Sequence, residues 1–123
     1  MHKILIVEDD QFLSKLYKIK LQKEGFEIEL AFDGQDGLEK FKSFKPELVL
    51  LDLIMPNMDG FTFLAKMKED PDLYSDKVPI IVFSNLGQDS DVQKAKELGA
   101  QDFFIKADIG LDKIVAKVRE YLK

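Results

Sequence analysis

Acidic residues follow two of the most apolar runs in the sequence. Glu8, Asp9 and Asp10 come directly after the run ILIV, and Asp52 ends the run LVLLD. Carboxylates held close together repel one another and raise one another's pKa unless a cation joins them. Oxygen ligands without cysteine or histidine nearby suit a hard ion, and a few carboxylates plus waters suit Mg²⁺. These residues predict a magnesium site, provided that the fold brings them together.

A hydroxyl and an amine extend this candidate site. Ser84 ends the run IIVFS, and Lys106 ends the run DFFIK. With both at contact distance from a phosphate, an aspartate beside bound Mg²⁺ could accept a phosphoryl group as an aspartyl phosphate. Each residue alone also has a simpler interpretation: a solvated acid, a turn or capping serine, and a surface lysine. Their joint placement at successive strand ends favours a functional site.

Short β-rich runs alternate five times with longer amphipathic segments, which is typical of an α/β protein. The predicted strands cover residues 3–7, 26–32, 48–52, 80–84 and 102–106. The second strand alternates apolar and polar residues, which indicates an edge strand, and the third is apolar on both faces. A polar stretch at 69–79 precedes the fourth strand. Strands buried on both faces favour a parallel sheet with right-handed crossovers and helices on both sides.

Five amphipathic segments predict the helices: residues 10–24, a segment ending near 44, residues 61–69, a segment ending before 99, and residues 111–122. The first helix should present one apolar face, made of Leu13, Leu16, Tyr17 and Leu21. Gly25 and Gly99 are placed to end the first and fourth helices. Ser90 or Asp91 should cap the fourth helix. In an open parallel sheet, ligands bind beyond the carboxyl ends of the strands, which is where Asp52 and the other candidate residues fall.

Composition excludes several classes of protein. The 123 residues make about one domain, so we expect a single domain over 1–123. There is no cysteine, and the single histidine, His2, lies next to the terminus, so catalysis by either residue type is not expected. A net charge of −5 argues against nucleic acid as a partner. No apolar run approaches the ~20 residues of a membrane helix, so we expect no membrane contact and a cytoplasmic location.

Four motifs, in this order and spacing, resemble the receiver domains of two-component response regulators over the whole chain. They are ILIVEDD, LLDLIMPNMDG, IIVFSN and FFIK. The resemblance implies a flavodoxin-like (βα)5 fold, a doubly wound parallel five-stranded sheet with the order 2-1-3-4-5 and helices on both faces.

The resemblance also implies a role for each site residue. Asp52 resembles the phosphoacceptor, Asp9 a direct Mg²⁺ ligand, and Glu8 a ligand acting through water. The backbone carbonyl of Ile54 would be a further ligand, beside Asp52 itself. Ser84 resembles the switch hydroxyl, Lys106 the lysine that pairs with the phosphoryl oxygens, and Phe103 the aromatic residue that turns inward on activation. The signal would then reach the surface of the fourth helix, fifth strand and fifth helix.

Two departures from the family pattern carry predictions of their own. Ala107 follows Lys106 where the family usually has a proline, often in a cis bond; a non-proline cis bond costs about 2.5–4 kcal/mol, so we predict a trans bond and a rearranged loop. Asn85 replaces a small residue, and Ile54 and Leu86 flank the site with apolar side chains. Because these three residues could hinder an attacking water, we expect them to tune the phosphoryl lifetime and to lengthen it.

The interpretation favoured by the sequence is a stand-alone response regulator. It would take a phosphoryl group from a histidine kinase or phosphotransfer protein and signal by binding an unknown downstream protein, with a possible phosphorylation-dependent dimer. It would not be an enzyme beyond catalysing its own phosphorylation and dephosphorylation. Alternatives are a receiver-like module that needs no phosphorylation, and a receiver cut from a larger regulator or hybrid kinase. A phosphohydrolase commonly needs a second aspartate at position 54, and a flavin or nucleotide carrier would need a Gly- or Ser-rich loop instead of VEDDQF.

Overall fold

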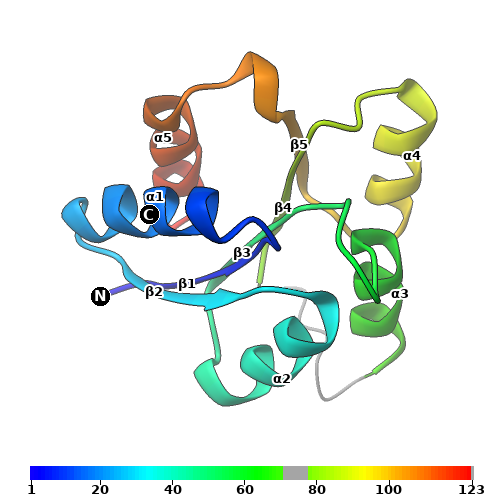
Figure 1. Cartoon of the computed structure of the whole chain (residues 1–123), viewed down its shortest axis with the longest axis horizontal. Coiled ribbons are helices and arrows are strands. Elements are labelled where there is room, and N and C mark those ends of the chain that lie inside the picture. The colour runs from blue at the N-terminus through cyan, green and yellow to red at the C-terminus, as the bar shows by residue number, and fades with distance from the viewer. Residues whose placement is uncertain (71–77, 123) are drawn as a thin grey trace.

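Five parallel strands form the centre of the protein, and helices cover both faces of the sheet (Figure 1). The computed structural model describes residues 1–70 and 78–122. The elements in chain order are β1 (Lys3–Val7), α1 (Gln11–Lys23), β2 (Glu27–Ala31), α2 (Gly34–Phe44), β3 (Leu48–Leu51), α3 (Gly60–Glu69), β4 (Ile80–Ser84), α4 (Asp89–Glu97), β5 (Asp102–Ile105), a short 3-10 helix η1 (Lys106–Asp108) and α5 (Leu111–Tyr121). Most of the polar stretch predicted at 69–79 lies outside the described residues.

The strand order is β2-β1-β3-β4-β5, with every pair parallel, as predicted. The register pairs Val7 of β1 with Ala31 of β2 on one side and with Leu51 of β3 on the other. β2 lies at one edge and β5 at the other. Since β1 and β3 are neighbours that end in register, the residues that follow them leave the sheet side by side.

Side chains from the two faces of the sheet enter two separate hydrophobic clusters. One cluster packs alternate strand residues such as Leu5 and Val7 against α2, α3 and α4. The other packs Ile4 and Ile6 against α1 and α5. Figure 1 shows α1 and α5 together on one side of the sheet. This two-sided burial explains why β1, β3 and β4 read as nearly continuous apolar runs.

Polar side chains fix where α1, α2 and α3 begin. Asp10 accepts hydrogen bonds from the amides of Phe12 and Leu13, at 3.0 and 3.1 Å, and so caps α1. Asp33 and Asp59 cap α2 and α3 in the same way. Gly25 and Gly99, which follow α1 and α4, have φ of 95° and 110°, a left-handed conformation that glycine adopts without strain. The two predicted glycine stops are confirmed.

Three details of the predicted elements are wrong. Leu16 does not belong to the buried face of α1, because its side chain is 39% exposed while Tyr17 and Leu21 are buried. Neither Ser90 nor Asp91 caps α4: both lie inside the helix, which begins after Gln88 without a side-chain cap. Lys106 begins η1 instead of ending β5, because the chain turns as soon as it leaves the sheet.

The remaining predicted elements match the structure within one or two residues. α5 buries Ile114, Val115 and Val118 as expected, with Leu111 and Leu122 at the margin of the same cluster. No helix in the described part of the chain is both long and apolar enough to span a membrane.

Candidate functional site

Three carboxylates meet at the carboxyl edge of the sheet. Glu8 and Asp9 follow β1, and Asp52 follows β3, whose backbone is tied to β1 by a 3.0 Å hydrogen bond from the Asp52 amide to the Val7 carbonyl. One carboxylate oxygen from each of Glu8, Asp9 and Asp52 lies within 4.8 Å of the others. Glu8 and Asp52 are buried, at 3% and 6% exposure, and Asp9 is exposed. The first expectation, that the fold brings these acids together, is confirmed.

The expectation that Asp10 joins these acids is wrong, because it is not part of the cluster formed by Glu8, Asp9 and Asp52. Its side chain is turned toward the first amides of α1, which it caps. Its own amide donates to Glu8 Oε1 at 3.3 Å. The tight turn from β1 into α1 thus holds Glu8 while directing Asp10 away from the cluster.

Lys106 reaches the acids from the other side of the site. Its ammonium group lies 2.7 Å from Glu8 Oε2 and 3.3 Å from Asp52 Oδ2, and its side chain is 12% exposed. Since β4 lies between β3 and β5, the lysine extends across the end of β4 to make these contacts. One ammonium therefore partly compensates two buried carboxylates.

These contacts shift the titration of the buried pair. Burial raises the pKa of Glu8 to about 7; the hydrogen bond from Lys106 opposes this rise, and the negative charge of Asp52 adds to it. For Lys106, burial lowers the pKa, but the hydrogen bond to Glu8 and the charges of Asp52 and Glu8 outweigh it, so the net pKa lies above its ordinary value. Lys106 stays charged at neutral pH while Glu8 is close to its midpoint.

Ser84 ends β4, the strand beside β3, at the carboxyl edge of the sheet, and is fully buried. Its hydroxyl oxygen accepts a 3.4 Å hydrogen bond from the Leu86 amide. Within the described residues, it makes no hydrogen bond to Glu8, Asp9 or Asp52. The hydroxyl is therefore held by the first residues of the β4–α4 loop.

Three residues were predicted to tune the phosphoryl lifetime from beside the site, and they are buried to different degrees. Ile54 is 54% exposed, and its amide donates to Asp52 Oδ1 at 3.4 Å. Leu86 is half-buried and packs against the cluster under α3 and α4. Asn85 is exposed. All three lie in the two loops that follow β3 and β4, beside Asp52 and Ser84.

Gly60 fixes the loop that carries Ile54. A Cβ atom at Gly60 would lie 2.6 Å from the Asp52 carbonyl oxygen and 2.7 Å from the Leu53 Cα, so only glycine fits. The Gly60 amide donates to the Leu53 carbonyl at 2.9 Å, and Asp59 then caps α3. The start of α3 is thereby packed directly against the backbone of the phosphoacceptor candidate.

Phe103 and Phe104 point to opposite faces of β5, as alternate strand residues do. Phe103 is half-buried against the α2–α3–α4 cluster, and Phe104 against the α1–α5 cluster. Phe103 pairs in register with Val82 of β4, two residues before Ser84. The predicted inward movement of Phe103 concerns a second state and stays a prediction.

The Lys106–Ala107 bond is trans, as predicted, since no peptide bond in the described residues is cis. Residues Lys106–Asp108 form the 3-10 turn η1 in place of a simple loop. Lys106 still reaches Glu8 and Asp52 from this turn.

The sequence did not predict that two residues of α1 lie beside the acids. Ser14 is fully buried and its hydroxyl donates to the Glu8 carbonyl at 3.2 Å. Tyr17 is 7% exposed and lines a small cavity together with Glu8 and Asp52. The available signal was the pair of polar groups, three residues apart, on the otherwise apolar face of α1.

The donor set fits a hard divalent cation. Carboxylate oxygens of Glu8, Asp9 and Asp52 gather at one point, with neither thiolate nor imidazole among them. Oxygen-only sites with a few carboxylates are suited to Mg²⁺, which keeps several of its own waters. The side chains that would hold such an ion are the three carboxylates predicted from the sequence.

A doubly wound parallel sheet with an acid cluster beyond the carboxyl ends of β1 and β3 defines a flavodoxin-like protein with a site at its topological switch point. The family model for the response regulator receiver domain matches residues 4–119. The chain therefore belongs to the response regulator receiver domain family, whose members are signalling switches that take phosphoryl groups from histidine kinases.

Relatives and solved structures agree with this assignment. The chain is 35% identical to the chemotaxis protein CheY of Treponema pallidum, covering 99% of this chain and 83% of that protein, and 41% identical to CheY of Bacillus subtilis over 85% of each. It spans about half the length of two further curated relatives, 53% of one and 50% of the other. A two-component response regulator from Clostridium difficile has a TM-score of 0.90 at 28% identity, with 99% of this chain and 96% of that chain covered.

Proposed function

We propose that this protein is a stand-alone response regulator that acts in the cytoplasm, in which Asp52 receives a phosphoryl group from a phosphohistidine donor in a Mg²⁺-dependent reaction. The supporting observation is the placement of Asp52: its buried carboxylate lies within 4.8 Å of the Glu8 and Asp9 oxygens and 3.3 Å from the Lys106 ammonium. A buried acid that shares one point with two other acids and a lysine suits both a divalent cation and a phosphoryl group.

The transfer needs few protein groups. A carboxylate oxygen of Asp52 forms a bond to phosphorus, while the bond from phosphorus to the donor's imidazole nitrogen breaks and leaves its electron pair on that nitrogen. Glu8, Asp9, Asp52 and the Ile54 carbonyl would hold Mg²⁺, with Glu8 acting through water; the ion would supply charge for the phosphoryl oxygens. Lys106 would leave Glu8 and pair with those oxygens.

The signal would leave the site through Ser84 and Phe103. On phosphorylation the Ser84 hydroxyl would donate to a phosphoryl oxygen in place of its contact with the Leu86 amide, and Phe103 would turn inward. The α4–β5–α5 surface would then bind a downstream protein or a second copy of the chain. β5 is an edge strand whose residues, Phe104 among them, are only half-buried, which supports this surface as the output side.

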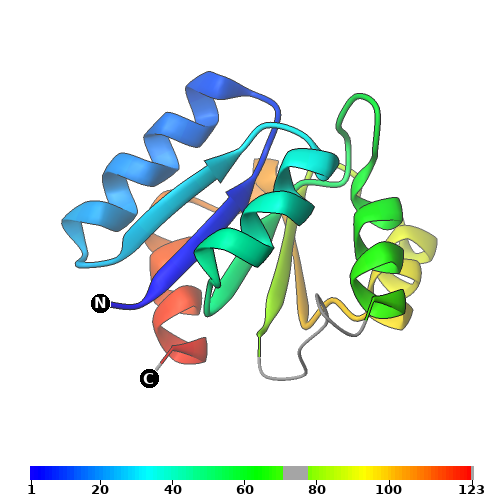
Figure 2. The same cartoon turned by 90° about the horizontal axis from the view of Figure 1, so that it is seen from below.

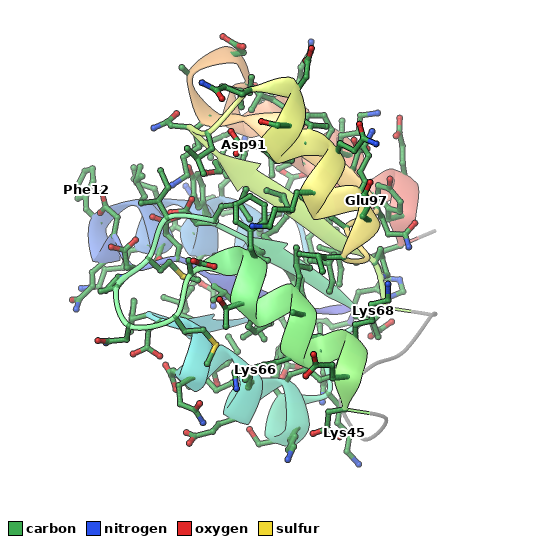
Figure 3. All side chains as sticks on the ribbon, turned by 90° about the vertical axis from the view of Figure 1, so that its right-hand side faces the viewer. Phe12, Lys45, Lys66, Lys68, Asp91 and Glu97 are labelled. Carbon is green, nitrogen blue, oxygen red and sulfur yellow. The ribbon has the colours of Figure 1, made fainter. Side chains whose placement is uncertain are left out.

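An exposed apolar stripe on α1 supports a protein as the phosphoryl donor. Phe12, Leu16 and Ile19 are 72%, 39% and 51% exposed and share one side of the helix that begins beside Glu8 and Asp9. Figure 3 shows Phe12 standing clear of the neighbouring side chains at the start of α1. Apolar side chains that remain in water next to a reactive site fit a docking surface for a histidine kinase or phosphotransfer protein.

The test is the intact mass of the protein after incubation with acetyl phosphate. We expect one added phosphoryl group with Mg²⁺, none with EDTA, and none for Asp52→Asn. Ser90→Ala, which removes a hydroxyl outside the site, is the matched control and should be modified like the wild type.

Two results would contradict the proposal. An adduct on Asp52→Asn would place the acceptor elsewhere. If neither acetyl phosphate nor a panel of phosphorylated histidine kinases gave an adduct, the receiver-like module that works without phosphorylation would replace it. Comparison with a longer chain that contains this sequence would test the other alternative, a receiver within a larger regulator.

A further inference from the structure

The edge of the sheet at β2 lies outside the site described above. A strand at an edge presents backbone amides and carbonyls that can pair with a strand of another chain. The Ala31 carbonyl accepts a 3.0 Å hydrogen bond from the Glu8 amide, so Ala31 faces β1. Because successive residues of a strand face opposite sides in the plane of a parallel sheet, the backbone groups of Ile28 and Leu30 point away from β1. A further strand would have to bind these groups.

Charged side chains occupy this edge at the C-terminal half of β2. The Leu30 amide donates to Glu29 Oε1 at 3.0 Å, and the Leu30 carbonyl accepts from the Lys40 ammonium at 2.5 Å. The Phe32 amide, which follows the strand on the same side, donates to Asp36 Oδ2 at 3.3 Å. Backbone groups that an added strand would need are therefore bonded to side chains of the same chain.

Lys40 joins these side chains into one network. Its ammonium lies 3.4 Å from Asp36 Oδ2 and 3.8 Å from Glu29 Oε1. Lys40 and Asp36 lie one turn apart on α2, which reaches the edge of the sheet beside β2. A strand that approached β2 would have to displace the ammonium from a carbonyl and the Glu29 carboxylate from an amide. It would also remove both charges from water, which is unfavourable.

We propose that Glu29, Asp36 and Lys40 form an edge guard, which closes β2 to strand addition by a second copy of the chain. A second copy is the partner that fits this edge, because two β2 strands related by a two-fold axis could pair Ile28 of one with Leu30 of the other. Charged side chains, lysine above all, commonly block edge strands in this way. Association of copies is thereby directed to the opposite edge, at β5.

The test measures self-association of the double variant Glu29→Thr, Lys40→Met by sedimentation equilibrium, in EDTA and without a phosphoryl donor. The substitutions free the amide and the carbonyl of Leu30. We expect the association constant to rise at least about tenfold over the wild type, because two further backbone hydrogen bonds can form. Hydrogen exchange of the Ile28 amide should slow as the concentration of the variant is raised. Lys40→Met alone frees only the carbonyl and should give a smaller rise.

The double variant Lys20→Met, Asp112→Thr is the matched control. Lys20 and Asp112 form an ion pair of 2.9 Å between α1 and α5. Each double variant loses one charge of each sign, so both keep the net charge of −5. The control should associate no more than the wild type. Similar urea midpoints of the two double variants, measured in dilute solution, would separate an opened edge from a general loss of stability.

Three results would overturn the edge guard. The first is association of the Glu29→Thr, Lys40→Met variant no stronger than that of the control. The second is association that leaves exchange of the Ile28 amide unchanged, because the copies would then meet elsewhere. The third is a wild type whose Ile28 amide becomes protected at high concentration, because its β2 edge would already be open. None of these results bears on phosphorylation of Asp52, and a wild type that no donor phosphorylates would leave the edge guard standing.

Discussion

Lys106 shows how the site keeps two buried acids in the absence of a divalent cation. Its ammonium contacts Glu8 at 2.7 Å and Asp52 at 3.3 Å, and it is the only Lys or Arg that does so among the described residues. Removing one partner of a buried ion pair leaves the other charge uncompensated. Lys106 therefore stabilises the metal-free protein, in addition to its proposed role of pairing with the phosphoryl oxygens.

Glu8 makes the stability of the metal-free protein depend on pH. Its pKa is about 7 in the folded protein and about 4.5 when unfolded, so the folded state binds more protons between these values. The contribution of Glu8 to the unfolding free energy is therefore fully present below about pH 4.5 and is lost as the pH rises through 7. At about 1.4 kcal/mol per pKa unit, the loss is up to about 3 kcal/mol.

Urea unfolding in EDTA at several pH values between 5 and 8 measures this effect. We expect Glu8→Gln, which cannot ionise, to lose less stability than the wild type over this range. Comparing the two proteins cancels the other titrating groups. Equal pH dependence in both would show that Glu8 titrates normally.

Ile54 and Leu86 should lengthen the lifetime of the aspartyl phosphate, because apolar side chains beside the acceptor hinder the approach of water. We expect the double variant Ile54→Asn, Leu86→Gln to lose its phosphoryl group severalfold faster than the wild type after the donor is removed. Ile19→Asn, which changes an equally exposed apolar residue on α1, serves as the control. An unchanged decay rate in the double variant would reject the shielding role and would leave Asn85 as the remaining candidate.

The placement of the candidate site residues was predictable one by one because each lies at the end of an apolar strand or directly after it. The sequence alone located Glu8, Asp9, Asp52, Ser84 and Lys106, and parallel pairing of neighbouring strands then brought them to one edge. Tyr17 was not predictable in this way. Its position relative to Glu8 depends on how α1 packs on β4, which sequence spacing does not specify.

At the scale of elements, the close approach of α3 to β3 links the fold to the chemistry. A methyl group at Gly60 would overlap the backbone of Asp52 and Leu53. Backbone atoms in the core cannot move aside as a flexible side chain can. This contact therefore restricts position 60 to glycine more strictly than most turns would.

We therefore expect Gly60→Ala to lower the unfolding free energy by about 1–3 kcal/mol, as overpacking does, and to slow phosphorylation by displacing Asp52. Chemical denaturation and the acetyl phosphate assay measure the two effects. Gly110→Ala is the control, since a Cβ there meets open space. Equal stability of the two variants would mean that the β3–α3 loop relaxes without cost.

Helix boundaries were predictable where an aspartate stands before an amphipathic segment or a glycine follows it, as at Asp10, Gly25 and Gly99. The start of α4 was not, because Ser90 and Asp91 offer the right side chains but lie inside the helix. Of the residues of α4, only Ala95 is buried. Contacts with α3 hold this polar helix, including Lys94 over the Phe61 ring at 4.5 Å and Lys68 Nζ to the Glu97 carbonyl at 3.2 Å. Such contacts between elements leave no periodic signal in the sequence.

At the scale of the whole molecule, a bound cation should stabilise the fold. A ligand that binds only the native state adds about 2.7 kcal/mol to the unfolding free energy at a concentration 100 times its dissociation constant. We expect Mg²⁺ to produce such an increase in the wild type and to have little effect on Asp9→Asn. Thermal or urea unfolding in Mg²⁺ and in EDTA, with NaCl at equal ionic strength, measures it. If the NaCl sample gained as much as the Mg²⁺ sample, the acids would be responding to general screening and not to a bound ion.

The two ends of the described chain lie together, at the end of the sheet away from the acids. Met1, His2 and Leu122 line one pocket there, and Figure 2 shows the two termini at the same end of the molecule. A short glycine linker could join them and form a circular permutant whose new ends open in the exposed turn at Gly110. Every strand pairing and every contact of Asp52 would be retained in such a chain. The order of the elements along the chain could thus be changed without changing how the site residues are arranged in space.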